Sequence, residues 1–471
     1  MFWCYITFRM MDSNSISRRD FLGKAGVATV CLTIVPSIVL GRKVGKTAPS
    51  DKLNIAGIGI GGRGYEVLRN MASENIVALC DVDWKYGDKC FKAFPKASRY
   101  RDWRRMLDEM GKTIDAVMIA TPNHTHAIIA AHSMIAGKHV YVEQPLAHTI
   151  YESRLLTKLA EKYKVATQMG NQGSSQEGVR KICEWIWNDE IGDVRKVEAF
   201  TDRTALPQKL NNSKKGMMVP DSLSWDMFIG PASLRPYHEM YTPYNWREWW
   251  DFGIGVLGDM ACHIMHPAFK ALNLAYVSKA QGSSTSLFND CVPNAQIISM
   301  KFAERPAVAK AGFPEAEIVW YNGGIQPMKP EGWPAGKNMN DSGGGVLFHG
   351  SKETLVRGCY GKDPWLLSGR LPIVTNTLPR VLGEQHELDW IRACKENYQN
   401  RVETSSPFSD AGPLNEIILV GALATRLQAL NTELLWDRGN MRFSNISNDQ
   451  YVKELIKPTY RQGWTLPEMP A

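Results

Sequence analysis

The chain has 471 residues, 44% of them hydrophobic, which is enough for two domains with separate cores. Its formal charge of +7 is spread thinly, and no basic run alternates with aromatic residues, so the composition disfavours nucleic acid as a partner. Nine cysteines occur without a C-x-x-C pair, which favours small buried hydrophobic residues over a disulfide framework or a zinc site.

The first part of the chain, residues 1–48, reads as an export signal and linker. Residues 17–23 are SRRDFLG, a twin-arginine pattern, and the apolar run that follows at residues 26–40 is short for a membrane span. The segment resembles a twin-arginine signal, which implies the twin-arginine export machinery as a partner and a periplasmic or otherwise exported location. An ordinary N-terminal arm is the alternative.

Residues 52–83 combine a short apolar strand, a glycine-rich turn, a helix and a second strand. The glycines have the G-x-G-x-x-G spacing, and they are Gly57, Gly59 and Gly62. Without Cβ atoms they let a diphosphate approach the backbone and the N–H groups of a helix that begins near Arg63. The second strand ends at Asp81, where dinucleotide-binding folds place an acid on the ribose hydroxyls. Because this acid would repel a ribose phosphate, the pattern predicts NAD in preference to NADP.

Helices and strands then alternate up to residue 170. Helices are expected at residues 102–110, 125–136 and 150–164, and buried strands at residues 114–120, 138–143 and 165–170. This alternation predicts a parallel sheet of about six strands, a Rossmann-type α/β domain over residues 49–170. Ligands of such sheets bind at the carboxyl ends of the strands, where two polar loops lie. These loops add four candidate cofactor contacts: Thr121, Asn123, His126 and Glu143.

The alternation of helices and parallel strands ends after Asn171. Strand-like runs at residues 194–203, 296–302, 316–323 and 345–351, joined by long connections, predict a second domain of the α+β kind over residues 171–471. Its sheet is expected to be mostly antiparallel and open on one face.

Asp259 and His263 stand four residues apart on an expected helix that follows a glycine-rich turn. This spacing puts both side chains on one helix face, where a carboxylate could orient the imidazole and raise its basicity for work as a general base on a sugar hydroxyl. A helix acid beside a core histidine is the alternative.

Five motifs together resemble the glucose/fructose oxidoreductase and inositol dehydrogenase family (Gfo/Idh/MocA), in particular its exported Bacteroidetes-type branch. They are the glycine turn of residues 57–64, Pro122-Asn123-x-x-His126, Glu143-Gln144-Pro145, Trp246-Arg247-x-x-Trp250-Asp251-Phe252-Gly253 and Gly258-Asp259-x-x-x-His263. The resemblance implies NAD or NADP in the first domain, a sugar or polyol on the sheet of the second, and catalytic roles for Asp259 and His263. It also implies a homo-oligomer formed through the C-terminal sheet.

Two positions depart from the family pattern. The family usually has a lysine where this chain has Gln144, which can hydrogen-bond the reacting alcohol but cannot titrate, so proton transfer would fall to His263 or else His126. His266 stands where the branch often has an acid. It stays open whether the protein catalyses the ordinary reaction of the family, a variant of it or no reaction.

Other polar and aromatic residues are candidate substrate contacts: Asn171, Gln172, Arg203, Trp246, Arg247 and Trp250. The tryptophans could stack on a sugar or belong to the core, and the arginines could bind hydroxyls or form structural ion pairs. No metal site is expected from His124, His126 and His132, because no cysteine or carboxylate completes a set.

The sequence therefore predicts an NAD-dependent oxidoreductase that acts on a sugar or glycoside, with Gln144 orienting the alcohol. One alternative is a redox-neutral hydrolase or lyase that oxidises, eliminates and re-reduces, as the resemblance to NAD-dependent α-N-acetylgalactosaminidases implies. The other is a nucleotide-bound sugar-binding protein without turnover.

Overall fold

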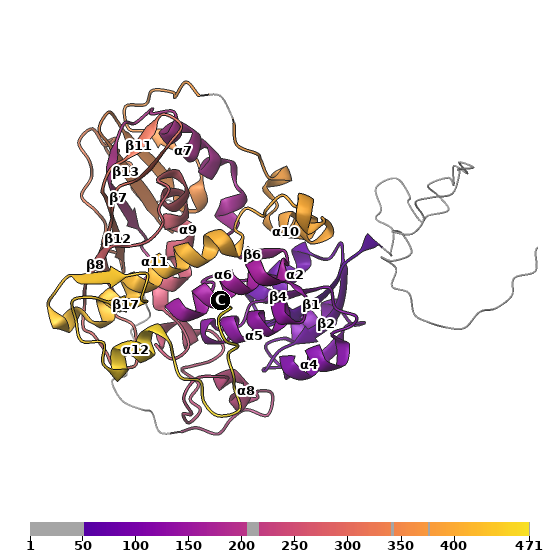
Figure 1. Ribbon diagram of the computed structural model, residues 1–471. Helices are drawn as coiled ribbons and strands as arrows, with labels where there is room; N and C mark the ends of the chain where they lie inside the picture. Colours follow the sequence, from indigo (N-terminus) through magenta and orange to yellow (C-terminus); the bar gives the residue numbers. More distant parts are fainter. Residues whose placement is uncertain (1–50, 205–215, 341–342, 375–376, 471) are drawn as a thin grey trace, which may run out of the picture. The chain divides into compact units, whose positions relative to one another are not determined.

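The computed structural model describes residues 51–204, 216–340, 343–374 and 377–470 (Figure 1). The twin-arginine pattern and the apolar run after it lie outside the described residues. From Leu53 onward the chain forms one compact unit. The predicted domain boundary at residue 170 stays a prediction.

The first sheet has six parallel strands in the order β3-β2-β1-β4-β5-β6, which confirms the predicted dinucleotide-binding architecture. Its strands are β1 (Asn54–Ile58), β2 (Asn75–Cys80), β3 (Ser98–Tyr100), β4 (Ala116–Ile119), β5 (His139–Val142) and β6 (Thr167–Met169). The helices between them are α2 (Arg63–Asn70), α3 (Asp88–Ala93), α4 (Trp103–Met110), α5 (Asn123–Ile135) and α6 (Ile150–Tyr163). The apolar runs that predicted β1 and β4 are almost entirely buried, as strands covered on both faces require.

The second sheet has nine strands in the order β15-β14-β13-β7-β12-β9-β8-β16-β17. The pair β7–β12 is parallel and the other neighbours are antiparallel, so the predicted mostly antiparallel sheet is confirmed. Its strands are β7 (Val194–Phe200), β8 (Lys279–Ser284), β9 (Gln296–Phe302), β12 (Ala316–Asn322), β13 (Gly345–Gly350), β14 (Thr354–Gly358), β15 (Trp365–Leu366), β16 (Leu434–Asp437) and β17 (Arg442–Phe443). A separate hairpin joins β10 (Arg305–Val308) and β11 (Ala311–Phe313).

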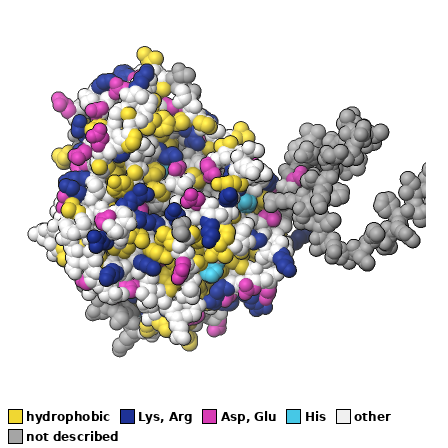
Figure 2. All heavy atoms as spheres, viewed as in Figure 1, with side chains coloured by type: hydrophobic (Ala, Val, Ile, Leu, Met, Phe, Trp, Pro, Cys, Tyr) yellow, Lys and Arg dark blue, Asp and Glu magenta, His cyan; other side chains and the backbone are white. Residues whose placement is uncertain are grey.

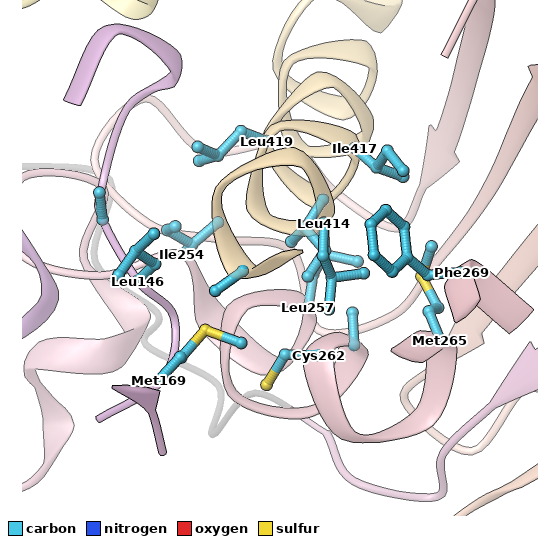
Figure 3. Close-up of a cluster of buried hydrophobic side chains, with 14 of the residues drawn as sticks. Leu146, Met169, Ile254, Leu257, Cys262, Met265, Phe269, Leu414, Ile417 and Leu419 are labelled. Carbon is cyan, nitrogen blue, oxygen red and sulfur yellow. The ribbon is translucent and has the colours of Figure 1, made fainter. Parts of the chain in front are cut away.

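Two long helices, α9 (Gly255–Ala271) and α11 (Phe408–Arg426), pack on the second sheet. Helix α11 also contacts α6 and β6, so it joins the two sheets. Figure 3 shows the apolar side chains at this junction, with Leu257 and Phe269 of α9 near Leu414 and Ile417 of α11. The helix that carries Asp259 and His263 is thus held in a core shared by both sheets. The remaining helices of this part are α7 (Glu177–Trp187), α8 (Trp225–Ile229), α10 (His386–Lys395) and α12 (Gln450–Ile456).

Helix α10 packs against the first sheet although it lies late in the chain. The Trp390 side chain is 0% exposed and meets the Tyr141 ring edge-on, with ring centroids 5.7 Å apart. At the end of the helix, Lys395 pairs with Glu74, whose carboxylate also accepts from the Leu53 N–H at the start of β1. Residues of the predicted second domain therefore complete the core of the first.

On the face drawn in Figure 2, lysine and arginine side chains are interspersed with acidic and apolar ones. Across the described ranges, no helix has both the length and the apolar character needed to cross a membrane. The seven cysteines in those ranges are buried, which agrees with their interpretation as small core residues.

Candidate active site

The glycine turn after β1 has the close contacts that its spacing predicts. A Cβ at Gly57 would lie 2.6 Å from Leu68, and one at Gly59, which has φ +74°, would lie 2.7 Å from the Thr121 backbone nitrogen. Gly62 has φ +48° and precedes the first residue of α2. Side chains at these positions would push the helix and the neighbouring loop away from the strand.

Asp81 lies at the end of β2 and faces this turn. Its carboxylate accepts hydrogen bonds from the N–H groups of Ile60 (2.9 Å), Gly61 (3.1 Å) and Asp83 (2.9 Å). Burial raises the pKa of Asp81 to about 6, although these three hydrogen bonds act in the opposite direction. The carboxylate thus fixes the turn and also borders the pocket described next.

A pocket of about 930 Å³, including its open mouth, lies along the carboxyl ends of β1, β2 and β4. It is lined on one side by Gly59, Gly61, Arg63, Asp81 and Thr121 and on the other by Phe228, Pro243, Trp246 and Arg247. The side-chain nitrogen and oxygen of Asn123, which is buried just beyond Pro122 of this lining, have no hydrogen-bond partner among the described residues. The glycine turn, the acid and this unsatisfied amide fit a dinucleotide.

His126 contacts both polar loops at this end of the sheet. Its Nδ1 lies 2.8 Å from the Pro145 carbonyl oxygen and its Nε2 lies 2.7 Å from that of Thr121. Burial lowers its pKa to about 4. Both ring nitrogens thus face backbone carbonyl groups, and the role of His126 as the alternative base stays a prediction.

Glu143 is the centre of a buried polar cluster beside Arg63. Its carboxylate accepts from Arg63 Nε, the Tyr141 hydroxyl and Gln172 Nε2, each at 3.2 Å. Burial raises its pKa, while Arg63 opposes the rise. Gln172, expected to contact substrate, here holds Glu143 in place, and Arg63 also lies 3.7 Å from Glu387 at the start of α10.

Gln144 connects this cluster to His263. The neighbours of its amide assign the nitrogen to the side of two acceptors and the oxygen to the side of a donor: the nitrogen then donates to the Glu143 carboxylate and, at 2.8 Å, to the Gly170 carbonyl oxygen, and the oxygen accepts from His263 Nε2 at 3.2 Å. Both amide N–H groups are therefore used inside the protein. These contacts orient His263; that Gln144 orients the reacting alcohol stays a prediction.

His263 lies on α9 between two amides. Its Nδ1 is 3.2 Å from Asn171 Oδ1, opposite the Gln144 contact at Nε2, and its side chain is 3% exposed. Burial lowers its pKa to about 3, and the positive charges of Arg63 and Arg203 add to this effect. The ring is thus neutral near pH 7.

Asp259 does not support His263, contrary to the prediction from their spacing. Its Oδ2 lies 2.9 Å from Nε of Arg247, in the 3₁₀ turn η3 (Asn245–Glu248). A carboxylate gains more from a charged guanidinium than from a neutral imidazole, and Asn171 occupies Nδ1 of His263. Asp259 and His263 share a helix face and lie at the same site, but no hydrogen bond joins them.

The predicted aromatic contacts separate into two groups. Trp246 lines the dinucleotide pocket, and the Arg247 guanidinium lies 4.2 Å from its ring centroid. Trp250 is 7% exposed, belongs to the main core and lies under Arg426 at 4.8 Å, so the core interpretation replaces its predicted contact with substrate. Arg203 is exposed near Asp259 and its side chain lies beside Gly343.

Three histidines of α5 point to different neighbours. His124 lies near the carbonyl groups of Phe228 and Ile229, His126 braces the loops, and His132 lies near the Thr465 carbonyl. Within the part of the chain that the structure describes, no three His, Cys, Asp or Glu side chains are grouped as metal ligands.

The sequence did not point to Tyr360, whose ring packs on His263 with centroids 4.7 Å apart. It follows β14 in a 3₁₀ turn, η4 (Cys359–Gly361). The tyrosine–glycine pair could have indicated a turn, but no local pattern links this turn to α9.

Two family descriptions match successive parts of the chain. The description "Oxidoreductase family, NAD-binding Rossmann fold" matches residues 53–171, and "Oxidoreductase family, C-terminal alpha/beta domain" matches residues 196–305. Both are Gfo/Idh/MocA descriptions and fall on the first sheet and on the start of the second. The chain belongs to the Gfo/Idh/MocA family of oxidoreductases, and its first domain has the NAD-binding Rossmann fold.

Among curated proteins, the chain is similar to glycosyl hydrolase family 109 protein 1 of Shewanella sp. (strain ANA-3), with 31% identity over 175 residues. This match covers 32% of the chain and 38% of the relative, so it spans well under half of either protein.

Among solved structures, the fold is similar to that of a levoglucosan dehydrogenase in complex with NADH and levoglucosan (18% identity, TM-score 0.53, 82% of this chain and 99% of that one). It is also similar to the WlbA dehydrogenase from Bordetella pertussis in complex with NADH and UDP-GlcNAcA (14%, 0.54, 82% and 99%).

Proposed function

We propose that this protein is an NAD-dependent enzyme that oxidises a ring hydroxyl of a sugar or glycoside, with His263 as the base. The observation that carries the proposal is the position of His263. A buried, neutral imidazole is connected through Gln144 and Glu143 to Arg63, which lines the dinucleotide pocket. The sugar-acting relatives support the choice of substrate class.

When bound, NAD supplies an acceptor for the hydride of the carbon that bears the hydroxyl. Gly59, Gly61, Arg63, Asp81 and Thr121 line the pocket that would hold it. The hydroxyl proton goes to His263. The protonated ring has two N–H donors, and amide oxygens of Gln144 and Asn171 lie 3.2 Å from the two ring nitrogens. A neutral ring donates to one of these oxygens, and its other nitrogen is the proton acceptor; the amide that faces this nitrogen has to turn aside for the sugar hydroxyl to reach it.

Redox-neutral cleavage of a glycoside is a second candidate, favoured by the similarity of this chain to a glycosyl hydrolase family 109 protein. Oxidation at one ring carbon acidifies the neighbouring C–H, a base removes that proton and the aglycone leaves with formation of a C=C bond. Water then adds to this bond in a hydrolase, and the hydride taken up in the first step returns to the carbonyl carbon. A sugar-binding protein without turnover is the third candidate, because Gln144 replaces the lysine that the family resemblance implies.

One experiment separates the three. NAD-loaded protein is mixed with a panel of free sugars and aryl glycosides, and nicotinamide absorbance and aglycone release are followed together. Lasting NADH indicates a dehydrogenase, and aglycone release with at most transient NADH indicates redox-neutral cleavage. No change with any compound, while sugars still bind in calorimetry, would contradict both enzymatic proposals.

A further inference from the structure

Tyr360 has a backbone conformation that is uncommon for a bulky residue. Its φ of 60° and ψ of 16° lie in the left-handed region. Two glycines let the turn that carries it pack closely against its neighbours. A Cβ at Gly173 would lie 3.0 Å from Tyr360 Cα, and a Cβ at Gly178 would lie 1.5 Å from the Gly361 carbonyl oxygen. Strained residues that the surroundings hold in this way cluster at functional sites.

The strained turn places the Tyr360 ring on His263. The centroids are 4.7 Å apart and the ring planes are inclined by 49°. No described residue forms a hydrogen bond with the Tyr360 hydroxyl, and the side chain is partly exposed. Burial raises the pKa of this phenol while Arg203 and Arg63 oppose the rise, so the group is a neutral donor near pH 7.

Gln144 offers no hydrogen-bond donor to a substrate. Both N–H groups of Gln144 are directed to Glu143 and Gly170, so this amide has none left for a sugar oxygen. Proton removal by His263 leaves negative charge on that oxygen, and a nearby donor would stabilise it. Among the described residues that contact His263, Asn171 also has a side-chain nitrogen without a partner, but it is fully buried, whereas the Tyr360 phenol is partly exposed and can be reached by a substrate.

We propose that Tyr360 is a catalytic residue whose hydroxyl donates a hydrogen bond to the sugar oxygen from which His263 takes the proton. The proposal rests on the function proposed above. It assigns to Tyr360 the donor role for which Gln144 has no free N–H, and makes Tyr360 and His263 a donor–base pair.

The test compares Tyr360→Phe with the wild type on the compound that gives the strongest nicotinamide or aglycone signal. Phenylalanine keeps the ring contact with His263 and removes only the hydroxyl. We expect kcat to fall by about 100-fold, with little change in NAD affinity, melting temperature or KM, and an altered high-pH limb of kcat. Tyr398→Phe, an exposed position packed under Lys164 and Arg401, is the matched control.

The outcomes distinguish the two proposals. If the wild type is active and Tyr360→Phe keeps its kcat and its pH profile, the hydroxyl has no catalytic role and this inference is wrong while the proposed function stands. A loss of kcat that is matched by a loss of melting temperature, and that Tyr360→Trp shares equally, would assign Tyr360 a packing role. If the wild type itself acts on none of the compounds, the proposed function fails first.

Discussion

The Asp259 carboxylate lies 2.9 Å from Arg247 Nε, and this ion pair joins the helix that carries His263 to the turn that lines the dinucleotide pocket. Burial raises the pKa of Asp259, while Arg247 and Arg203 oppose the rise. Asp259 lies one helical turn from His263, and Arg247 lines the dinucleotide pocket. The ion pair therefore connects these two parts of the site.

Replacing Asp259 with Asn should leave the Arg247 guanidinium without its acidic partner. We expect the free energy of unfolding to fall by about 1 to 3 kcal/mol and NAD to bind more weakly, while the pH dependence of turnover stays that of the wild type. Chemical denaturation, calorimetry and a double-mutant cycle with Arg247→Gln measure these effects. A changed pH profile with unchanged stability would instead support pairing of Asp259 with His263.

His263→Ala removes the proposed base and leaves the dinucleotide pocket intact. Turnover should fall by about 100- to 10,000-fold, and the dissociation constant for NAD should change little because His263 does not line the pocket. His132→Ala, on the far part of α5 near the Thr465 carbonyl, serves as the control. Retention of more than about a tenth of wild-type turnover would rule His263 out as the base.

Gln144→Lys should change the pH dependence of turnover. A lysine can still donate to Glu143 and Gly170 but cannot accept from His263 Nε2, and it adds a titrating group at this position. We expect a new ionisation in the profile of kcat/KM against pH. Gln144→Met is the matched control, because it removes the same acceptor without adding a charge; the same profile in both variants would show that the charge has no effect.

Binding of NAD should weaken in acid because of Asp81. Its raised pKa of about 6 means that the ligand-free protein takes up a proton as the pH falls from 6 towards the usual value of 3.8. This proton stabilises the ligand-free fold in that window, and the gain is lost as the pH rises through 6. A ribose hydroxyl needs the ionised carboxylate, so the dissociation constant should rise about tenfold per pH unit below pH 6.

Calorimetry at several pH values tests this, together with the preference for NAD over NADP. Asp81→Asn should flatten the pH dependence and reduce the preference. Tighter binding of NADP than of NAD by the wild type would overturn the role given to Asp81.

Export through the twin-arginine machinery stays a proposal based on residues 17–23. We expect the folded, NAD-loaded protein outside the cytoplasm, and retention inside when Arg18 and Arg19 are both replaced by Lys. Cell fractionation with a cofactor assay measures this. An unchanged location of the variant would show that the arginine pair is not an export signal.

The sequence predicted the elements whose signals are local. The apolar run at residues 114–120 became β4, and the glycine turn and Asp81 lie together because one strand–helix–strand unit positions them. Strand β3 was missed because its three residues, Ser98–Tyr100, contain no apolar run, and helix α3 was missed as well.

Helix spacing does not determine which polar side chains of the site pair with one another. Asp259 and His263 share a helix face as predicted, but Arg247 competes for the carboxylate and Asn171 for the imidazole. Tyr360 reaches His263 through a strained turn held by Gly173 and Gly178, which are distant in sequence. Such contacts follow from the tertiary arrangement and leave no periodic signal in the chain.

Helix α10 has a consequence for the order in which this protein is made. Trp390 and Ile391 fill the core beside β1 and β5, and Arg63, next to the glycine turn, faces Glu387. A nascent chain that has emerged only to residue 170 would expose this apolar surface and leave Arg63 without one of its acidic partners. We therefore expect the nucleotide pocket to reach its final form only after the chain up to Lys395 has been made.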